Sequence, residues 1–271
     1  MRLSYKTKRG ELIGEGDASL FLADGNGGYF TLGSPSNSHY QGWFTFLNSE
    51  WELYKIIEDI SPIGIPNKII NMGDVMQRHI VSSREKFWVH KNALIYTISN
   101  YQGPIDVTLD FRRVHDFDDK GRIYEIKKDK GVTVIHYKKY YDNSLQNLKE
   151  EFFLAVKGNV EFVPQNKWIE RNYSYDKSRD VKSNFYVYNA FKMYVYSEKN
   201  NLIIFGFGKT QEEAISNCKK EYRKHKFFLG KNAFGKKSYK SKEDIAKKAL
   251  DNLIIKPNQD MGIFAGLPWF Y

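Results

Sequence analysis

Residues 20–44 read LFLADGNGGYFTLGSPSNSHYQGWF, a stretch that predicts a strand, a tight turn and a second strand. Its apolar start, 20–23, leads into three glycines around Asn26, and the run 29–32 then alternates in side-chain character. Glycine and asparagine tolerate the positive φ angles that tight hairpin turns require. The stretch therefore predicts antiparallel strands whose ends carry aromatic and polar side chains.

These side chains allow two interpretations. Turn glycines mostly serve backbone geometry, so a well-packed rim of hairpins is the simpler one. Aromatic faces beside hydrogen-bonding groups also suit sugar rings, so a carbohydrate-facing surface is the other. The candidate sugar contacts in this stretch are Tyr29, His39, Tyr40 and Trp43.

Short runs with strand character continue through the first three quarters of the chain. They recur every ten residues or so and are separated by turn residues, a pattern typical of an antiparallel β-sandwich. Lys157, Gly158 and Asn159 predict a hairpin that pairs 152–156 with 160–163. The strands 185–196 and 202–207 complete a mainly β domain over residues 1–208.

The segment 107–116, VTLDFRRVHD, places charged residues at the end of a strand. Alternation puts Asp110 and Arg112 on one face and Arg113 on the other. We expect Arg113 and His115 at the rim of the sheet. His115 and the aspartates of 116–119 also suggest a metal site, but this run is better interpreted as a hairpin loop, and no second histidine cluster completes a ligand set.

The periodicity changes at Thr210. Thr210 and Glu213 form a capping box that predicts a helix, and residues 209–240 are expected to form this linker helix and a basic linker. A second capping box, Ser241 with Asp244, predicts another helix in 241–271. The single cysteine, Cys218, falls in the first helix and is expected to be a buried, inert thiol.

Composition bounds the class of protein. The 271 residues contain no apolar run near the roughly 20 residues of a membrane span. The start lacks the hydrophobic segment of a secretory signal, and the lone cysteine fits a reducing compartment, so we expect a cytoplasmic protein without cofactors. The net charge is +10, but 219–248 alone hold twelve Lys or Arg and three acidic residues. Such a local basic segment is typical of a solvated helix face, so nucleic-acid binding is the least favoured interpretation.

Four segments resemble one family. The segments 24–29 (DGNGGY) with 37–42 (NSHYQG), 111–115 (FRRVH), and 168–172 (WIERN) resemble the N-terminal domain of prokaryotic glycogen debranching enzymes of the amylo-α-1,6-glucosidase type. The family's usual leucine is replaced by Asn26, its arginine pair is reduced to His39, and its histidine is replaced by Gln41. Trp168 joins the candidate residues through this resemblance.

The last ten residues, GIFAGLPWFY, carry the most specific resemblance. They are similar to a segment near the start of the catalytic (α/α)6 barrel of these enzymes and of related glucoamylases. The resemblance implies that 241–271 begin an incomplete barrel, as part of a truncated or divided polypeptide. It adds Trp269 as a candidate glucan-site or barrel-interface residue, and it implies that the apolar tail is either poorly ordered or packed on a neighbour.

The resemblance implies a β-sandwich (supersandwich) followed by a linker helix and the first barrel helix. It further implies a noncatalytic domain of an enzyme that hydrolyses α-1,6-glucosidic branch linkages in glycogen or starch. Both catalytic carboxylates would lie in the barrel, so no catalytic or metal-binding residue is expected in this chain. The expected partners are that barrel and an α-glucan. A freestanding carbohydrate-binding module is the alternative, ahead of a nucleic-acid binder.

Overall fold

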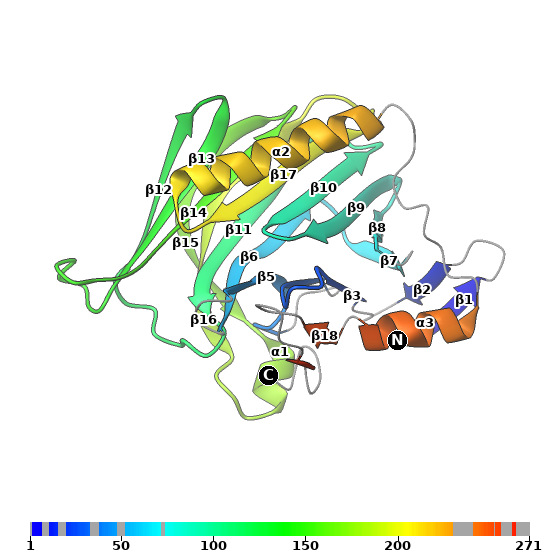
Figure 1. Cartoon of the computed structure of the whole chain (residues 1–271), viewed down its shortest axis with the longest axis horizontal. Helices are drawn as coiled ribbons and strands as arrows, with labels where there is room; N and C mark the ends of the chain where they lie inside the picture. Colours follow the sequence, from blue (N-terminus) through cyan, green and yellow to red (C-terminus); the bar gives the residue numbers. More distant parts are fainter. Residues whose placement is uncertain are drawn as a thin grey trace.

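The structure is a computed structural model that describes residues 2–6, 11–15, 20–32, 38–47, 52–71, 74–229, 241–251, 253–255 and 262–263. Most of this chain forms two antiparallel sheets, which we call sheet A and sheet B (Figure 1). The prediction of a mainly β, antiparallel fold is confirmed.

Sheet A has ten strands. In spatial order they are β1 (Arg2–Lys6), β2 (Glu11–Glu15), β7 (Pro66–Asn71), β8 (Met76–Ile80), β9 (Ser83–His90), β10 (Ala93–Ser99), β17 (Asn201–Gly208), β14 (Leu148–Gly158), β13 (Val132–Tyr140) and β12 (Arg122–Asp129).

Sheet B has seven strands. In spatial order they are β15 (Glu161–Asn172), β16 (Asn184–Val195), β11 (Gly103–Arg113), β6 (Glu52–Pro62), β5 (Gly42–Leu47), β4 (Tyr29–Leu32) and β3 (Leu20–Ala23). A short helix, α1 (Ser174–Ser178), lies between β15 and β16 in the chain.

Residues of both sheets form one large core. Phe30 of sheet B packs on Phe87 of sheet A with ring centroids 5.0 Å apart, and Phe111 stacks on Tyr137 across the same core at 5.0 Å. The alternation of β11 explains this: Leu109 and Phe111 point into the core, whereas Asp110 and Arg112 are buried outside the main cluster of apolar side chains. The two sheets therefore form the two layers of the fold.

One predicted hairpin is wrong. β14 pairs with β13 and β17 in sheet A, whereas β15 pairs with β16 in sheet B, so the turn after Gly158 leads from one sheet to the other. Close packing explains the glycine at position 158, because a Cβ there would lie 2.9 Å from the Ile203 side chain. The expected hairpin loop at 116–121 likewise joins β11 of sheet B to β12 of sheet A. Local turn signals do not say whether the next strand pairs beside the last or crosses the core.

The C-terminal part differs from expectation in two details. The composition of 227–240, rich in glycine and lysine, predicts that the linker begins at Phe227, but the linker helix, α2 (Gln211–Leu229), extends two residues beyond that point. The next helix, α3 (Lys242–Asp251), is followed by β18 (Ile254–Ile255), which pairs with β19 (Gly262–Ile263). Ile263 is 71% exposed, and residues 264–271, Trp269 included, lie outside the described residues. The barrel remains a prediction.

Helix α2 covers the outer face of sheet A, over β17 and β14 (Figure 1). Ala214, Ile215 and Cys218 pack there in an apolar cluster with Ile204 and other sheet residues. Burial raises the pKa of the Cys218 thiol to about 12, which fits an inert thiol. Within the part of the chain described, no helix has the length and apolarity of a membrane span.

The close contact of α2 with the sheet depends on Gly206. A Cβ at this position would lie 2.4 Å from the Cys218 backbone nitrogen, which cannot move without moving the helix. Gly206→Ala is therefore expected to lower the free energy of unfolding by about 1–3 kcal/mol. Urea unfolding followed by circular dichroism measures this. Lys220→Ala, on the exposed face of the same helix, should change it by less than about 0.5 kcal/mol.

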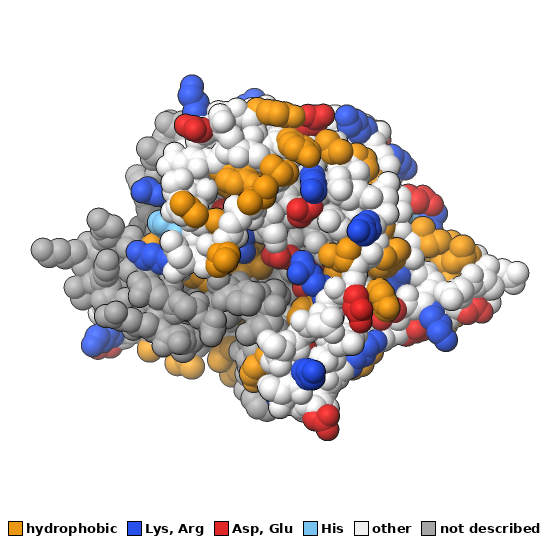
Figure 2. All heavy atoms as spheres, turned by 180° about the vertical axis from the view of Figure 1, so that it is seen from behind, with side chains coloured by type: hydrophobic (Ala, Val, Ile, Leu, Met, Phe, Trp, Pro, Cys, Tyr) orange, Lys and Arg blue, Asp and Glu red, His pale blue; other side chains and the backbone are white. Residues whose placement is uncertain are grey.

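The face opposite that of Figure 1 shows how charge is distributed. In Figure 2, the basic, acidic and hydrophobic side chains of the described residues are interspersed on this face. A basic stripe, the usual electrostatic footprint of nucleic-acid binding, is not seen among the described side chains in this view.

Candidate functional site

The glycine-rich turn has a structural explanation. Asp24 Oδ1 accepts the backbone N–H of Asn26 (2.7 Å) and of Gly28 (3.0 Å), which closes the turn. Gly25 and Gly27 have φ angles of +80° and +105°, which L side chains rarely adopt. A Cβ on Gly28 would lie 2.6 Å from Asp24 Oδ2. The motif therefore holds a half-buried carboxyl in a turn of glycines.

Tyr29 and Trp43 do not form a ligand rim. Tyr29 is fully buried, stacks on Phe44 at 4.5 Å and donates its hydroxyl to the Tyr40 carbonyl (3.3 Å). Trp43 is 1% exposed and belongs to the core between the sheets. Both lie on strands flanked by others in sheet B, so their rings fill space that solvent cannot reach. The simpler interpretation of a packed rim fits these two residues.

His39 is the centre of a buried contact between the turn before β5 and helix α1. Its Nδ1 lies 2.7 Å from Asp176 Oδ2, and Ser38 Oγ donates to Asp176 Oδ1 (2.6 Å). Its ring stacks on Phe185 (4.8 Å) and lies against Tyr40 (3.9 Å). Burial lowers the pKa of His39, which favours a neutral ring although Asp176 opposes this. A serine nucleophile would have to bond the imidazole, but here serine and histidine share one carboxylate, so the arrangement fastens α1 to the sheet.

Arg113 and His115 come to the end of the sheet as expected. Arg113 Nε donates to Glu150 Oε1 of β14 (2.7 Å), and its NH1 pairs with Glu52 of β6. The Arg113 side chain is 36% exposed and lies over the Tyr54 ring. His115 is exposed in the loop that follows β11. This part of the predicted rim is thus at the surface, with Arg113 linking the two sheets.

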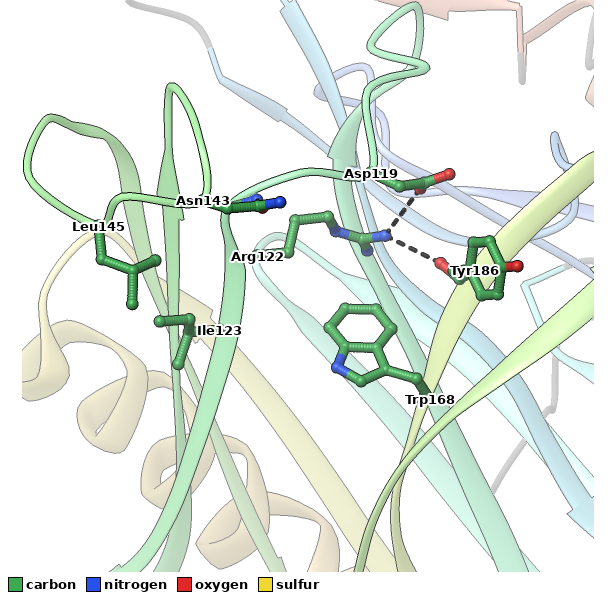
Figure 3. A pocket seen from close by; sticks show the side chains of 8 residues that line it. Asp119, Arg122, Ile123, Asn143, Leu145, Trp168 and Tyr186 are labelled. Atoms are coloured by element: carbon green, nitrogen blue, oxygen red, sulfur yellow. Dashed lines mark hydrogen bonds and ion pairs between the residues drawn. The ribbon is translucent and has the colours of Figure 1, made fainter.

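Trp168 lies at an open cavity of about 320 Å³ between the free edges of the sheets, which we call the mouth. β12 and β15 are the edge strands here. Figure 3 shows Arg122 between the Trp168 ring, Asp119 and Tyr186. Asn143, Leu145, Ile123 and Gly121 complete the lining.

The side chains of the mouth combine apolar rings with polar groups. Trp168 is 39% and Tyr186 is 52% exposed, so both rings are available to a ligand. Asp119 contributes a carboxylate that is held by Arg112 NH2 (2.8 Å) and Arg122 NH1 (3.3 Å). An aromatic surface beside a few fixed polar groups is typical of a site for a polyhydroxylated ring.

Arg122 holds the mouth in shape. Its guanidinium donates to Asp110 Oδ1 (2.7 Å), the Tyr186 carbonyl (2.9 Å) and the Tyr124 hydroxyl (3.1 Å), and it lies 5.1 Å from the centre of the Trp168 ring. The side chain is fully buried and connects β12 of sheet A with strands of sheet B. The orientation of the Trp168 ring is therefore fixed by Arg122, whose charge links the two sheets.

The carboxylate below Arg122 is ionised. Burial raises the pKa of Asp110, but the charges of Arg112, Arg122 and Lys55 outweigh burial and hold that pKa below its ordinary value. Lys55 also pairs with the buried Glu58. All of these groups are buried, so they support the mouth and do not offer carboxylates to a substrate.

Sequence reasoning identified Trp168 but not Asp119, Asn143 or Tyr186. Asp119 and Asn143 lie in loops whose residues are common in any turn, and Tyr186 is one of nineteen tyrosines. The available signal was alternation in β16, which alternates Tyr186 outward with the buried Phe185 and Val187. It shows exposure but not proximity to Trp168.

No protein-family model matches the chain. No curated protein matches it either. Among solved structures, a bacterial glucoamylase complexed with acarbose is similar with a TM-score of 0.36 and 10% sequence identity, over 89% of this chain. The chain spans 37% of the length of that glucoamylase.

Proposed function

We propose that this chain is a noncatalytic, α-glucan-binding β-sandwich domain of a glycoside hydrolase of the debranching type. The observation that carries the proposal is the mouth, where exposed Trp168 and Tyr186 lie beside the polar groups of Asp119 and Asn143, above the buried Arg122. Its two rings offer apolar surface to the C–H face of glucose, and its polar groups offer donors and acceptors to the hydroxyls.

The finer parts of the proposal come from the resemblance in the sequence. The segments 24–29 and 37–42 and the tail 262–271 favour a glycogen debranching enzyme, whose catalytic (α/α)6 barrel would be supplied by the same polypeptide or by a separate chain. In that arrangement residues 1–208 form the sandwich, 209–240 the linker and 241–271 the start of the barrel. Hydrolysis of α-1,6 branch linkages is then assigned to the barrel.

A freestanding carbohydrate-binding module is the second candidate, because the mouth supports it equally. The two differ in whether a barrel docks on the sandwich. Mixing the chain with the barrel of a debranching enzyme should give a complex on size-exclusion chromatography and restore branch hydrolysis under the first proposal. Under the second proposal, the chain binds glucan equally well with and without the barrel, and no complex forms.

The mouth predicts a specific loss of binding. Trp168→Ala should weaken maltoheptaose binding at least tenfold, because removal of an aromatic stacking surface costs about 1.5 kcal/mol or more. Amide chemical shifts of the labelled protein, titrated with maltoheptaose to tens of millimolar, measure the affinity. Trp168→Phe should retain most of it, since a smaller ring remains.

This experiment has two controls. Tyr196→Ala removes a ring that is 67% exposed but does not line the mouth, so its affinity should equal that of the wild type. Circular dichroism establishes that each variant is folded. Equal binding by folded Trp168→Ala and wild-type protein would refute the mouth as the glucan site.

A further inference from the structure

A second cavity, of about 400 Å³, lies at the glycine-rich turn. Asp24 and Asn26 line it from the β3–β4 turn, Asn92 from the β9–β10 turn, and Phe46 and Phe207 from β5 and β17. We call it the turn cavity. Nothing in the proposed function accounts for it.

The turn cavity, like the mouth, combines apolar and polar side chains. Phe46 and Leu47 provide apolar surface, since the Phe207 ring packs into the core, and two carboxyls, two amides and two lysine side chains provide hydrogen-bonding groups. Thr45 Oγ1 donates to Asn92 Oδ1 (3.0 Å), so the Asn92 amide is held in place while its nitrogen is not part of that bond. A neutral polyhydroxylated ring matches this lining better than an ion does, because carboxyl and ammonium groups occur together.

The strand registers place both cavities at one end of the sandwich. In sheet A, Ala93 pairs with Gly206, Gly208 with Phe153, and Leu148 with Tyr140, so the β9–β10 turn and the loop 141–147 lie at the same end. In sheet B, Leu47 pairs with Glu52 and Tyr54 with Arg113. This places the end of β5, at the turn cavity, beside the end of β11.

Arg113 lies at this end of the sandwich and joins the two sheets. Its guanidinium links Glu52 of sheet B to Glu150 of sheet A, and its side chain is 36% exposed. Arg113, which the sequence places at the rim of the sheet, is thus part of the surface at the end that both cavities share.

We propose that the mouth and the turn cavity are two subsites for one α-glucan chain, which crosses this end of the sandwich over Arg113. This inference rests on the proposed function and adds to it the substrate class, a chain of several glucose units. Occupying two linked sites raises affinity without any new contact, because the second binding event becomes intramolecular.

The test compares chain lengths in wild-type protein and two variants. Wild-type protein should bind long maltodextrin at least tenfold more tightly than maltotriose. Asn26→Trp fills the turn cavity from an exposed position and should remove this gain, while shifts at the Trp168 indole N–H upon maltotriose addition are unchanged. Asn26→Ala removes one amide but leaves the cavity open and the backbone N–H in place, so it should keep most of this gain.

The outcomes separate this inference from the proposed function. If Trp168→Ala abolishes binding and Asn26→Trp binds long chains as wild type does, the second subsite is refuted and the mouth stands. If Asn26→Trp weakens binding and Trp168→Ala does not, the mouth is refuted as a subsite, and the two-subsite chain with it. If no glucan of any length shifts the spectrum, both proposals fail.

Discussion

Replacing Arg122 by methionine is expected to lower the free energy of unfolding by about 3–5 kcal/mol. The guanidinium is fully buried and donates to Asp110, the Tyr186 carbonyl and the Tyr124 hydroxyl. Methionine fills part of the volume but donates nothing, so it leaves these acceptors in an apolar setting. Asp110 retains Arg112 (2.7 Å) as a partner, which keeps the loss below that of an isolated buried charge.

Chemical denaturation at pH 7 measures this loss. Arg171→Met is the matched control, because its side chain is 38% exposed and its partner Asp59 is 3.9 Å away. Exposed ion pairs contribute about 0–1 kcal/mol, so this variant should lose no more than that. Equal losses in the two variants would show that Arg122 does not hold the sheets together. Glucan binding by Arg122→Met should also weaken, since the Trp168 platform loses its support.

Asp24→Asn is expected to stabilise the protein at pH 8, by roughly 4 kcal/mol at most, and to change little at pH 4. Burial raises the pKa of Asp24 from 3.8 to about 7. Hydrogen bonds from backbone N–H groups, such as those of Asn26 and Gly28, lower this pKa but do not outweigh burial. The folded protein therefore binds this proton more tightly than the unfolded chain does. Wild-type stability falls as the pH rises from about 4 to about 7 and then stays level. Asparagine never ionises, and its amide oxygen can still accept the two N–H groups.

Denaturation curves at several pH values from 4 to 8 test whether the stability of the wild type falls as the pH rises, and over which pH range it falls. Asp180→Asn is the control, because Asp180 is exposed and has a φ angle of +58°, which asparagine tolerates. Its stability should stay within about 0.5 kcal/mol of the wild type at each pH. A gain for Asp24→Asn that is equal at pH 4 and pH 8 would contradict the raised pKa.

Much of the fold follows from local features of the sequence. Glycines at 25 and 27 fit the positive φ angles of the observed turn, and the capping residues Thr210 and Ser241 precede the two long helices as predicted. Alternation in β11 correctly separates the apolar Leu109 and Phe111 from Asp110 and Arg112. These features are local, because hydrogen bonds within a turn and the period of a strand involve residues close in the chain.

The sequence by itself determined the antiparallel strands, the helix starts and the aromatic content, together with one residue of the candidate site, Trp168. Only the tertiary structure decided that Gly158 leads from one sheet to the other, that Trp43 is enclosed in the core, and that Asp119 and Tyr186 meet Trp168. The reason is physical: sheet edges and cavities arise where strands distant in sequence pack together. Which side chains meet at such an edge depends on the pairing of all seventeen strands of the two sheets, and no local period encodes that pairing.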